Sequence, residues 1–428
     1  MKLRYWCLLG LLYFLQGFPA GLLVHALPPI LRSQGAPLEA IGFIKLLALP
    51  WVLKFLWAPY VERYYVTSAG KHRFWILLMQ ILTVFALTLM VFVDLSSLGV
   101  WNISLLFLLV FLLNTFCATQ DIATDGLAVK MLPAPLRGLG NSVQVSGYKV
   151  GLLFGGAAIL FGMDQIGWAP TLWLMAVLVA VCLLPVFLFK EISVSANVPV
   201  AAAIPEPNPA PKSHGLQWIL HQLISFTRRP GMTYWLVVMC LYKVGDSLGS
   251  AMIKPLLVDS GVSLTQLAEL TVIANLCGVV AAFVSGAIYL RLGPKFCLLA
   301  FGLMQGLSLG AYALIDGQSG WMFIMTVSIT EQVADAMATV ALFALMMAHC
   351  RAGSEGADYT LQACLQVMIA GVGSLVSGTI ARLLGFEFLF LLAMGVTWVC
   401  LIPLYRLFVK DQFAKLADKP FHPTSETA

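Results

Sequence analysis

Long apolar runs, separated by short polar segments, follow one another along almost the whole chain. A transmembrane helix needs about 20 consecutive apolar residues, and runs of this length fall into two groups. The first group covers residues 5–31, 38–61, 74–94, 102–129, 137–163 and 168–189. The second group covers residues 231–258, 265–290, 296–315, 321–348, 358–382 and 385–408. The pattern predicts an all-α membrane protein with twelve transmembrane helices, six in each half.

One long polar segment, residues 190–230, separates the two groups. Its first part is rich in proline, which is typical of an extended linker. From Gly215 to Thr227 apolar residues recur on one helical face, which predicts a helix lying on the membrane surface. The predicted domains are an N-terminal six-helix bundle at 1–190, a cytoplasmic linker with an interfacial helix at 191–230, a C-terminal six-helix bundle at 231–410 and a cytoplasmic tail at 411–428.

Composition narrows the possible classes of protein further. The chain has 60% apolar and 11% charged residues and a mean hydropathy of +0.90. Soluble domains carry about 25% charged residues, so a water-soluble enzyme is excluded. The net charge is +5, but the basic residues stand singly between apolar runs, which argues against nucleic acid as a partner. The nine cysteines lack the C-x-x-C spacing of a metal site, so no metal or other cofactor is expected.

The positions of the basic residues predict the orientation in the membrane. With an internal N-terminus, 18 of the 25 Lys and Arg residues fall on the inner side and five lysines fall within spans. Only Arg32 and Arg382 fall outside. Positive residues are enriched in cytoplasmic loops, so both termini are expected in the cytoplasm, with the lipid bilayer around the spans.

The two halves share a repeated pattern. Four residues of the first half recur 226 positions later: Pro29, Leu31, Gly35 and Leu38 match Pro255, Leu257, Gly261 and Leu264. A second match after spans two and eight has an offset of 228. Similar offsets at two places indicate two parallel six-span copies, the pseudo-symmetric arrangement known from the major facilitator fold.

The stretch G-A-I-Y-L-R-L-G-P-K, residues 286–295, resembles the loop G-x-L-a-D-R-x-G-R-K of the major facilitator superfamily. The resemblance implies a cytoplasmic gate whose charges contact neighbouring helix ends in one state and release them in the other. The second copy has Leu290 where the family has an acid, which puts its gate role in doubt. The charge bias of inner loops alone is the alternative explanation. The residues assigned to the gate are Glu62, Arg63, Arg73, Gly286, Arg291 and Lys295.

Four further stretches resemble AmpG-type permeases of that superfamily. They are Y-F-L-Q-G-F-P at 13–19, L-K-F-L-W-A-P at 53–59, A-T-Q-D-I-A-T-D at 118–125 and G-Y-K-V-G at 147–151. The AmpG type carries two more spans than this pattern predicts. The length and the stretch P-P-I-L-R-S-Q-G-A-P-L-E-A-I-G are more similar to the compact RhtX/FptX branch.

This resemblance implies a transporter of the bacterial inner membrane that imports a siderophore or iron-siderophore, driven by protons. An AmpG-type muropeptide permease is the alternative, and a transporter-like sensor without flux is a third possibility. The chain has no G-x-x-x-x-G-K-[ST] loop for ATP and no G-x-S-x-G or H-E-x-x-H motif, so it is not expected to be an enzyme.

Ten ionisable residues fall within the predicted spans, where charge is costly and therefore indicates function. The cations are Lys45, Lys54, Lys149, Lys243 and Lys254, and the anions are Asp121, Asp125, Asp246, Glu331 and Asp335. Asp121 and Asp125 share one helical face, and two close carboxylates favour uptake of a proton. Glu331 and Asp335 repeat the spacing. These four are the candidates for proton coupling, and Lys149 is expected to contact the first pair in one state. A structural ion pair is the alternative for the first pair, and coincidence for the second.

Other polar residues within the spans are candidates for lining a substrate cavity. They are Tyr13, Gln16, His25, Asn114, Lys149, Lys243, Asp246 and Lys254. Hydrogen bonds between helices, or a histidine packed between helices, explain the uncharged members equally well. Two stripes of small residues are expected to allow close helix packing. They are Gly151, Gly155 and Gly156, and Gly371, Ser374 and Gly378.

Overall fold

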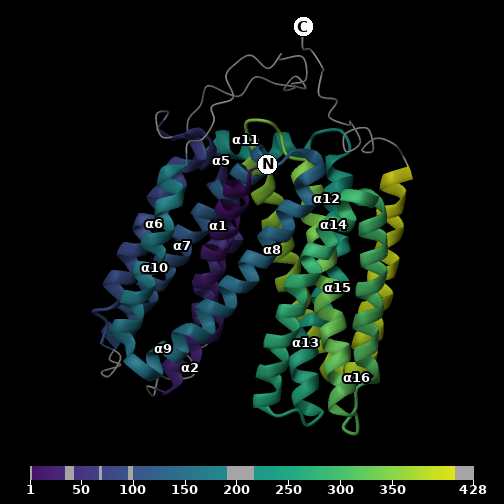
Figure 1. Cartoon of the computed structure of the whole chain (residues 1–428). Coiled ribbons are helices and arrows are strands. Elements are labelled where there is room, and N and C mark those ends of the chain that lie inside the picture. Colours follow the sequence, from purple (N-terminus) through teal and green to yellow (C-terminus); the bar gives the residue numbers. More distant parts are fainter. Residues whose placement is uncertain (1, 34–42, 67–69, 95–99, 190–215, 410–428) are drawn as a thin grey trace.

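The computed structural model describes residues 2–33, 43–66, 70–94, 100–189 and 216–409, and every regular element in these ranges is helical (Figure 1). Nine of the helical segments in these ranges are long and apolar enough to cross a membrane. The chain is therefore an all-helical, multi-span membrane protein, as the apolar runs predict. The proline-rich part of the predicted linker, the predicted tail and the repeat residues Gly35 and Leu38 lie outside the described residues.

The N-terminal half begins with a span that changes its helical form along its length. Its elements are α1 (Leu3–Gly21), the π-helical η1 (Leu22–Ala26) and α2 (Leu27–Ser33). The other long helices of this half are α6 (Lys71–Met90), α7 (Val100–Met131), α8 (Arg137–Leu153) and α10 (Trp168–Leu188). Shorter pieces complete the fifth span: η4 (Ala134–Leu136) before α8, then the π-helical η5 (Phe154–Ala158) and α9 (Ile159–Ile166).

The predicted second span is broken into short helices. Its described elements are η2 (Ile44–Ala48), α4 (Leu49–Leu53), η3 (Lys54–Leu56) and α5 (Ala58–Arg63). Pro50 and Pro59 stand in the first turns of α4 and α5. A proline ring clashes with the preceding helical turn and removes an N–H donor, so each proline starts a new helix instead of extending the previous one. The apolar run alone did not reveal these breaks.

The C-terminal half contains two very long helical segments. Its elements are α11 (Leu216–Thr227), α12 (Met232–Tyr242), α13 (Val244–Asp259), α14 (Leu264–Ala311), η7 (Tyr312–Leu314), α15 (Trp321–Ala348) and α16 (Glu355–Val409). Helix α11 lies where the amphipathic pattern predicts a helix. Gly293 in α14 has φ 74° and Gly385 in α16 has φ 86°, a left-handed conformation that interrupts a helix. Each segment is thus two helices joined at a glycine, matching two predicted spans.

The two halves contact each other along two seams. Helix α8 packs on α14 and α15, and α16 packs on α7 and on the broken second span. In Figure 1 the halves meet at the end where α1 begins, here called the terminal end. At the opposite end, the far end, the ribbons of α2 and α9 lie apart from those of α13 and α16. The two halves are therefore joined at one end of the molecule.

Within the N-terminal half, α1 and α8 approach so closely that their contact depends on glycine. A Cβ atom at Gly151 would lie 2.1 Å from the carbonyl oxygen of Phe14, and one at Gly155 would lie 2.0 Å from that of Phe18. A Cβ atom at Gly156 would lie 2.8 Å from the Cβ atom of His25. The expected packing role of this stripe is confirmed. The second stripe differs, because a Cβ atom at Gly371 would meet nothing within 4 Å.

Candidate proton and substrate site

A buried ion pair links the broken second span to α7. Lys54 is only 4% exposed, and its ammonium group contacts the carboxylate of Asp121, which is 6% exposed. Residues 54–56 form a short 3-10 helix between two proline-started helices, which places Lys54 opposite the middle of α7. Both residues are among the ionisable residues of the predicted spans, but the sequence does not show that they are partners.

Asp125 lies one turn further along α7 and has neutral partners. The hydroxyl of Tyr13 on α1 donates to Asp125 Oδ1 at 3.0 Å, and Gln144 Nε2 on α8 donates to the same atom at 3.3 Å. Asp125 itself is 2% exposed. Tyr359 on α16 donates to Gln144 Oε1 at 3.5 Å, which extends this network into the C-terminal half. Asp125 is therefore a buried carboxylate whose hydrogen-bond donors from α1 and α8 are neutral groups.

A second charged cluster lies in the C-terminal half. Lys243, at the junction of α12 and α13, contacts Asp246 at 2.8 Å and Asp335 of α15 at 2.9 Å. The hydroxyl of Thr339 donates to the same oxygen of Asp335 at 3.2 Å. Glu331 is 3% exposed and accepts a hydrogen bond from Gln332 Nε2 at 3.2 Å. Lys243, Asp246 and Asp335 therefore form one local network within the half.

Lys149 joins the two halves at this cluster. Its ammonium group, on α8, donates to Gln332 Oε1 at 2.9 Å and lies 4.0 Å from Asp335 Oδ2. The expected contact of Lys149 with Asp121 and Asp125 is not present in this conformation, because Lys149 reaches into the other half. Asp121 instead contacts Lys54. Asp125 instead accepts a hydrogen bond from Tyr13.

The remaining cavity candidates have different surroundings. Asn114 accepts a hydrogen bond from Trp51 Nε1 at 3.0 Å and donates to the Val110 carbonyl at 2.9 Å, so it fastens the broken span to α7. Gln16 is 3% exposed, and His25 is half-buried against Gly156. Lys254 on α13 is exposed. The side chain of Lys45 lies outside the described residues.

At the predicted gate, Glu62 and its neighbour Lys71 make contacts that cross between the halves. Glu62 of α5 accepts a hydrogen bond from the backbone N–H of Gly356 at the start of α16, and its other oxygen contacts Lys71 of α6. Lys71 also donates to the Gly353 carbonyl at 2.9 Å and lies 3.7 Å from Glu355. These contacts tie the N-terminal half to the start of α16.

His72 could join Glu62 and Glu355 as a metal ligand, since their ligand atoms lie within 4.8 Å of one another. We assign the group to the gate because Lys71 already supplies positive charge to both carboxylates.

Three other gate candidates, Arg63, Arg73 and Lys295, contact their own half or α11. The Arg63 guanidinium stacks over Trp218 of α11 at 4.6 Å, and Arg73 donates to the carbonyl oxygens of Val186 and Phe187 at the end of α10. Lys295 lies over the ring of Tyr405 at 5.2 Å. The last two candidates contribute differently: Gly286 allows α14 to approach α8 near Ser142, and Arg291 is exposed.

His349 follows α15 at the terminal end and lies outside the spans. Its ring stacks on Trp235 with centroids 4.3 Å apart, and its Nδ1 lies 2.7 Å from the Leu345 carbonyl oxygen. Burial lowers the pKa of His349 to about 4, and the charges of Arg229 and Arg137 act in the same direction against the opposing effect of the carbonyl. His349 is therefore neutral at physiological pH.

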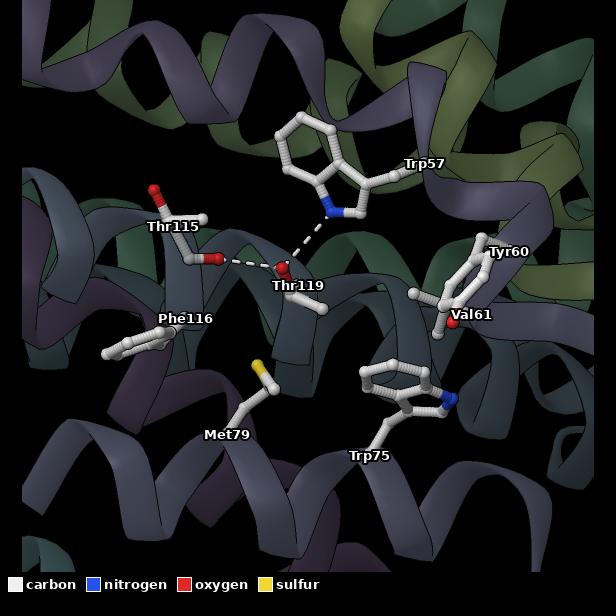
Figure 2. Close-up of a pocket in the computed structure, with 8 residues that line it drawn as sticks. All are labelled: Trp57, Tyr60, Val61, Trp75, Met79, Thr115, Phe116 and Thr119. Atoms are coloured by element: carbon white, nitrogen blue, oxygen red, sulfur yellow. Dashed lines mark hydrogen bonds between the residues drawn. The ribbon is translucent and has the colours of Figure 1, made fainter. Parts of the chain in front are cut away.

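An apolar groove of about 310 Å³ lies beside the broken span (Figure 2). Figure 2 shows the indole nitrogen of Trp57 directed at the hydroxyl of Thr119, which accepts its hydrogen bond at 3.1 Å. Tyr60, Trp75 and Phe116 are among the other lining residues. The polar and charged residues described above do not line this groove, so we do not assign a polar substrate to it.

Several residues of these networks were missed by reasoning from the sequence. Gln144, Gln332 and Tyr359 are uncharged, and no charge or motif distinguishes them from other polar residues in the spans. Lys54 was recognised as an intramembrane charge but was not placed in the site. Its partner lies on a helix far away in sequence, and only the packing of helices brings the two together.

Comparisons with known proteins agree with this architecture. A family model described as the Major Facilitator Superfamily matches residues 9–369. The anhydromuropeptide permease of Escherichia coli (strain K12) is 30% identical over 382 residues, which cover 87% of this chain and 73% of the permease. An uncharacterized protein of Haemophilus influenzae is 27% identical over 407 residues, covering 91% of this chain and 89% of that protein.

A solved structure shows the same fold. The proton:xylose symporter XylE bound to 6-bromo-6-deoxy-D-glucose superposes with a TM-score of 0.68, covering 94% of this chain and 95% of the symporter. The sequence identity is 11%, so this likeness concerns the fold alone.

Proposed function

This chain belongs to the Major Facilitator Superfamily, and we propose that, as a secondary transporter of this superfamily, it carries an anhydromuropeptide into the cytoplasm. The distant homology to an anhydromuropeptide permease supports this substrate class. The siderophore expected from the sequence has no such support, because no siderophore carrier is among the relatives described above. The alternative drawn from the AmpG-type motifs is therefore the better proposal.

We propose that the fold contains twelve spans in two six-helix bundles. Two glycine-interrupted segments, α14 and α16, count as two spans each, and the broken segment from η2 to α5 counts as one. Added to the other seven long segments, this gives twelve. The charge bias of the loops supports placing the terminal end in the cytoplasm of a bacterium, with the protein in the inner membrane.

The observation that best supports coupled transport is the position of Asp125. It is buried where α1, α7 and α8 meet, and Gln144 connects it to Tyr359 of the opposite half. A proton on Asp125 would weaken its acceptor role toward Tyr13 and Gln144, and so would alter contacts next to the seam. We propose proton symport through Asp125, with Asp121, Glu331 and Asp335 as further candidates.

The contacts between the halves at the terminal end bear on how the protein would move during transport. The halves are tied at the terminal end by Glu62 and Lys71 with the start of α16. Import requires these contacts to open while the far end closes. The conformation seen here is accordingly proposed to receive substrate from the far side.

Uptake by the full chain in proteoliposomes tests the proposal. With an inward-directed proton gradient, a radiolabelled anhydromuropeptide should accumulate above its external concentration, and a protonophore should abolish accumulation. Accumulation of a ferric siderophore instead would replace the substrate class. Binding of the muropeptide without accumulation would identify a sensor and reject transport.

A further inference from the structure

Lys149 differs from Lys54 and Lys243, two other lysines of the predicted spans that form ion pairs. Lys54 is paired directly with Asp121, and Lys243 contacts two aspartates at 2.8 and 2.9 Å. The close acceptor of Lys149 is the neutral amide of Gln332 at 2.9 Å, and its recorded ion pair with Asp335 spans 4.0 Å. Asp335 is also held more closely by Lys243. The acids near Lys149, Asp335 at 4.0 Å and Glu331 beside Gln332, therefore act on its charge without a close contact of the kind that the other two lysines make.

An ammonium group has three N–H donors, and Gln332 uses one of them. Burying a cation is costly unless it gains a charged or strongly polar partner. The side chain of Lys149 remains 13% exposed, close to the 15% of Lys243 and above the 5% of Lys54, so it is reachable and, unlike Lys243, has no close carboxylate among the described residues. Lys149 thus keeps both donor capacity and access for an additional acceptor.

The position of Lys149 on α8 is also distinctive. Along one face of α8, Ser142 donates to the Ala282 carbonyl at 2.6 Å, Ser146 donates to the Val279 carbonyl at 3.4 Å, and Lys149 then contacts Gln332. Within the described parts of α8 and η5, no hydrogen bond to the C-terminal half is found after Lys149. Among the described residues of α8 and η5, Lys149 is therefore the last one with a polar contact to the C-terminal half.

We propose that Lys149 anchors a carboxylate of the substrate, which takes the place of Gln332 on the ammonium group. This inference rests on the proposed function, because a peptide-bearing substrate carries carboxylates. The ammonium group would bind a carboxylate oxygen more strongly than the amide oxygen of Gln332, because both partners would then be charged. Since Lys149 comes from one half and Gln332 from the other, the exchange would also alter a contact between the halves.

The experiment compares two ligands that differ only in charge. Equilibrium binding to the purified full-length chain is measured for an anhydromuropeptide with free carboxylates and for the same molecule with its carboxylates converted to primary amides. The unmodified protein should bind the acid at least tenfold more tightly. Lys149→Gln should lower the affinity for the acid to that for the amide, without changing the affinity for the amide. Lys149→Arg should retain most of the preference because it keeps the charge.

Gln332→Leu serves as the matched control. It removes the competing acceptor but leaves the cation, so the preference for the acid should persist. Equal binding of acid and amide by the unmodified protein would overturn this inference and leave the proposed function intact, and this comparison does not depend on the folding of any variant. A retained preference in Lys149→Gln would also overturn it. Binding of neither ligand would reject the proposed substrate class and the inference together.

Discussion

At the residue scale, the two aspartates of α7 are alike in the sequence but have different partners. Asp121 has an ammonium partner in Lys54, whereas Asp125 has the hydroxyl of Tyr13 and the amide of Gln144. Removing one partner of a buried ion pair leaves the other as an uncompensated buried charge. We therefore expect the ion pair with Lys54 to give Asp121 a larger part in stability, and Asp125 remains the first candidate for the proposed proton exchange.

This division predicts different behaviour for three variants. Asp125→Asn should abolish accumulation of substrate against a gradient and leave substrate exchange at least partly intact, because the amide keeps hydrogen bonding but cannot titrate.

Lys54→Met should destabilise the fold by about 3 to 5 kcal/mol, because it leaves Asp121 buried and unpaired. Adding Asp121→Asn to Lys54→Met should restore much of the stability. Uptake, exchange and thermal unfolding of the purified variants measure these effects, and gradient-driven uptake by Asp125→Asn would contradict the coupling role.

A pH dependence is predicted at His349. The pKa of His349 is about 4 in the folded chain, below about 6.5 for an unperturbed histidine, so the unfolded chain binds the proton more tightly. Its contribution to stability is complete above pH 6.5 and declines by up to about 3 kcal/mol as the pH falls toward 4. His349→Asn should reduce this acid sensitivity. Thermal unfolding at pH 7.5 and pH 5 measures it, and an equal loss in both proteins would show that other groups are responsible.

At the element scale, the contact of α1 with α8 depends on how closely two backbones approach. The atom that a side chain at Gly151 would meet is a carbonyl oxygen of Phe14, which cannot rotate away as a flexible side chain can. Any larger residue must therefore move one whole helix. In contrast, Gly371 in α16 faces open space.

The two glycines are accordingly predicted to respond oppositely to the same substitution. Gly151→Ala should destabilise the protein by about 1 to 3 kcal/mol through overpacking. Gly371→Ala should stabilise it by up to about 1 kcal/mol, because alanine favours the helix and meets no neighbour. Thermal unfolding in one detergent compares both variants with the unmodified chain. A loss of equal size in both would contradict the packing argument.

The number and order of the helices could be predicted better than their interruptions. The apolar runs of 296–315 and 385–408 begin close to Gly293 and Gly385, so the predicted span boundaries fall near these interruptions. The breaks at Pro50 and Pro59 were not predicted, because a scan of hydropathy does not register missing backbone hydrogen bonds. The charged residues of the site could be named from the sequence, because placing a charge within a membrane span is costly in free energy. Their pairing could not, since Lys54 and Asp121 are 67 residues apart and nothing local relates them.

At the scale of the whole molecule, the terminal end is held closed by polar contacts between the halves. Glu62 accepts from the Gly356 N–H, and Cys364 of α16 donates to the Trp51 carbonyl at 3.6 Å deeper along the same seam. Cys364 is fully buried. Opening of the terminal end would expose it, so its thiol reports the conformational equilibrium.

Weakening the gate should therefore increase the reactivity of Cys364. In a variant that retains only this cysteine, Glu62→Ala should raise the rate of alkylation by a membrane-permeant maleimide about tenfold or more, because a hydrogen bond to a charged group contributes about 1.5 to 3 kcal/mol. Glu269→Ala removes an exposed acid of α14 and is the control, for which no change is expected. An unchanged rate in Glu62→Ala would mean that Glu62 does not hold the seam.

The paired π-helical turns η1 and η5 have a consequence for the phase of the spans that contain them. A π-helical turn holds about one residue more than an α-helical turn, so everything beyond it is rotated by about 100° relative to an uninterrupted helix. Because η1 and η5 pack against each other, both helices change phase at the same depth. Deletion of one residue from either turn alone would present the wrong faces of α2 or α9 to their neighbours. Related chains of different length should therefore gain or lose residues at these two turns together.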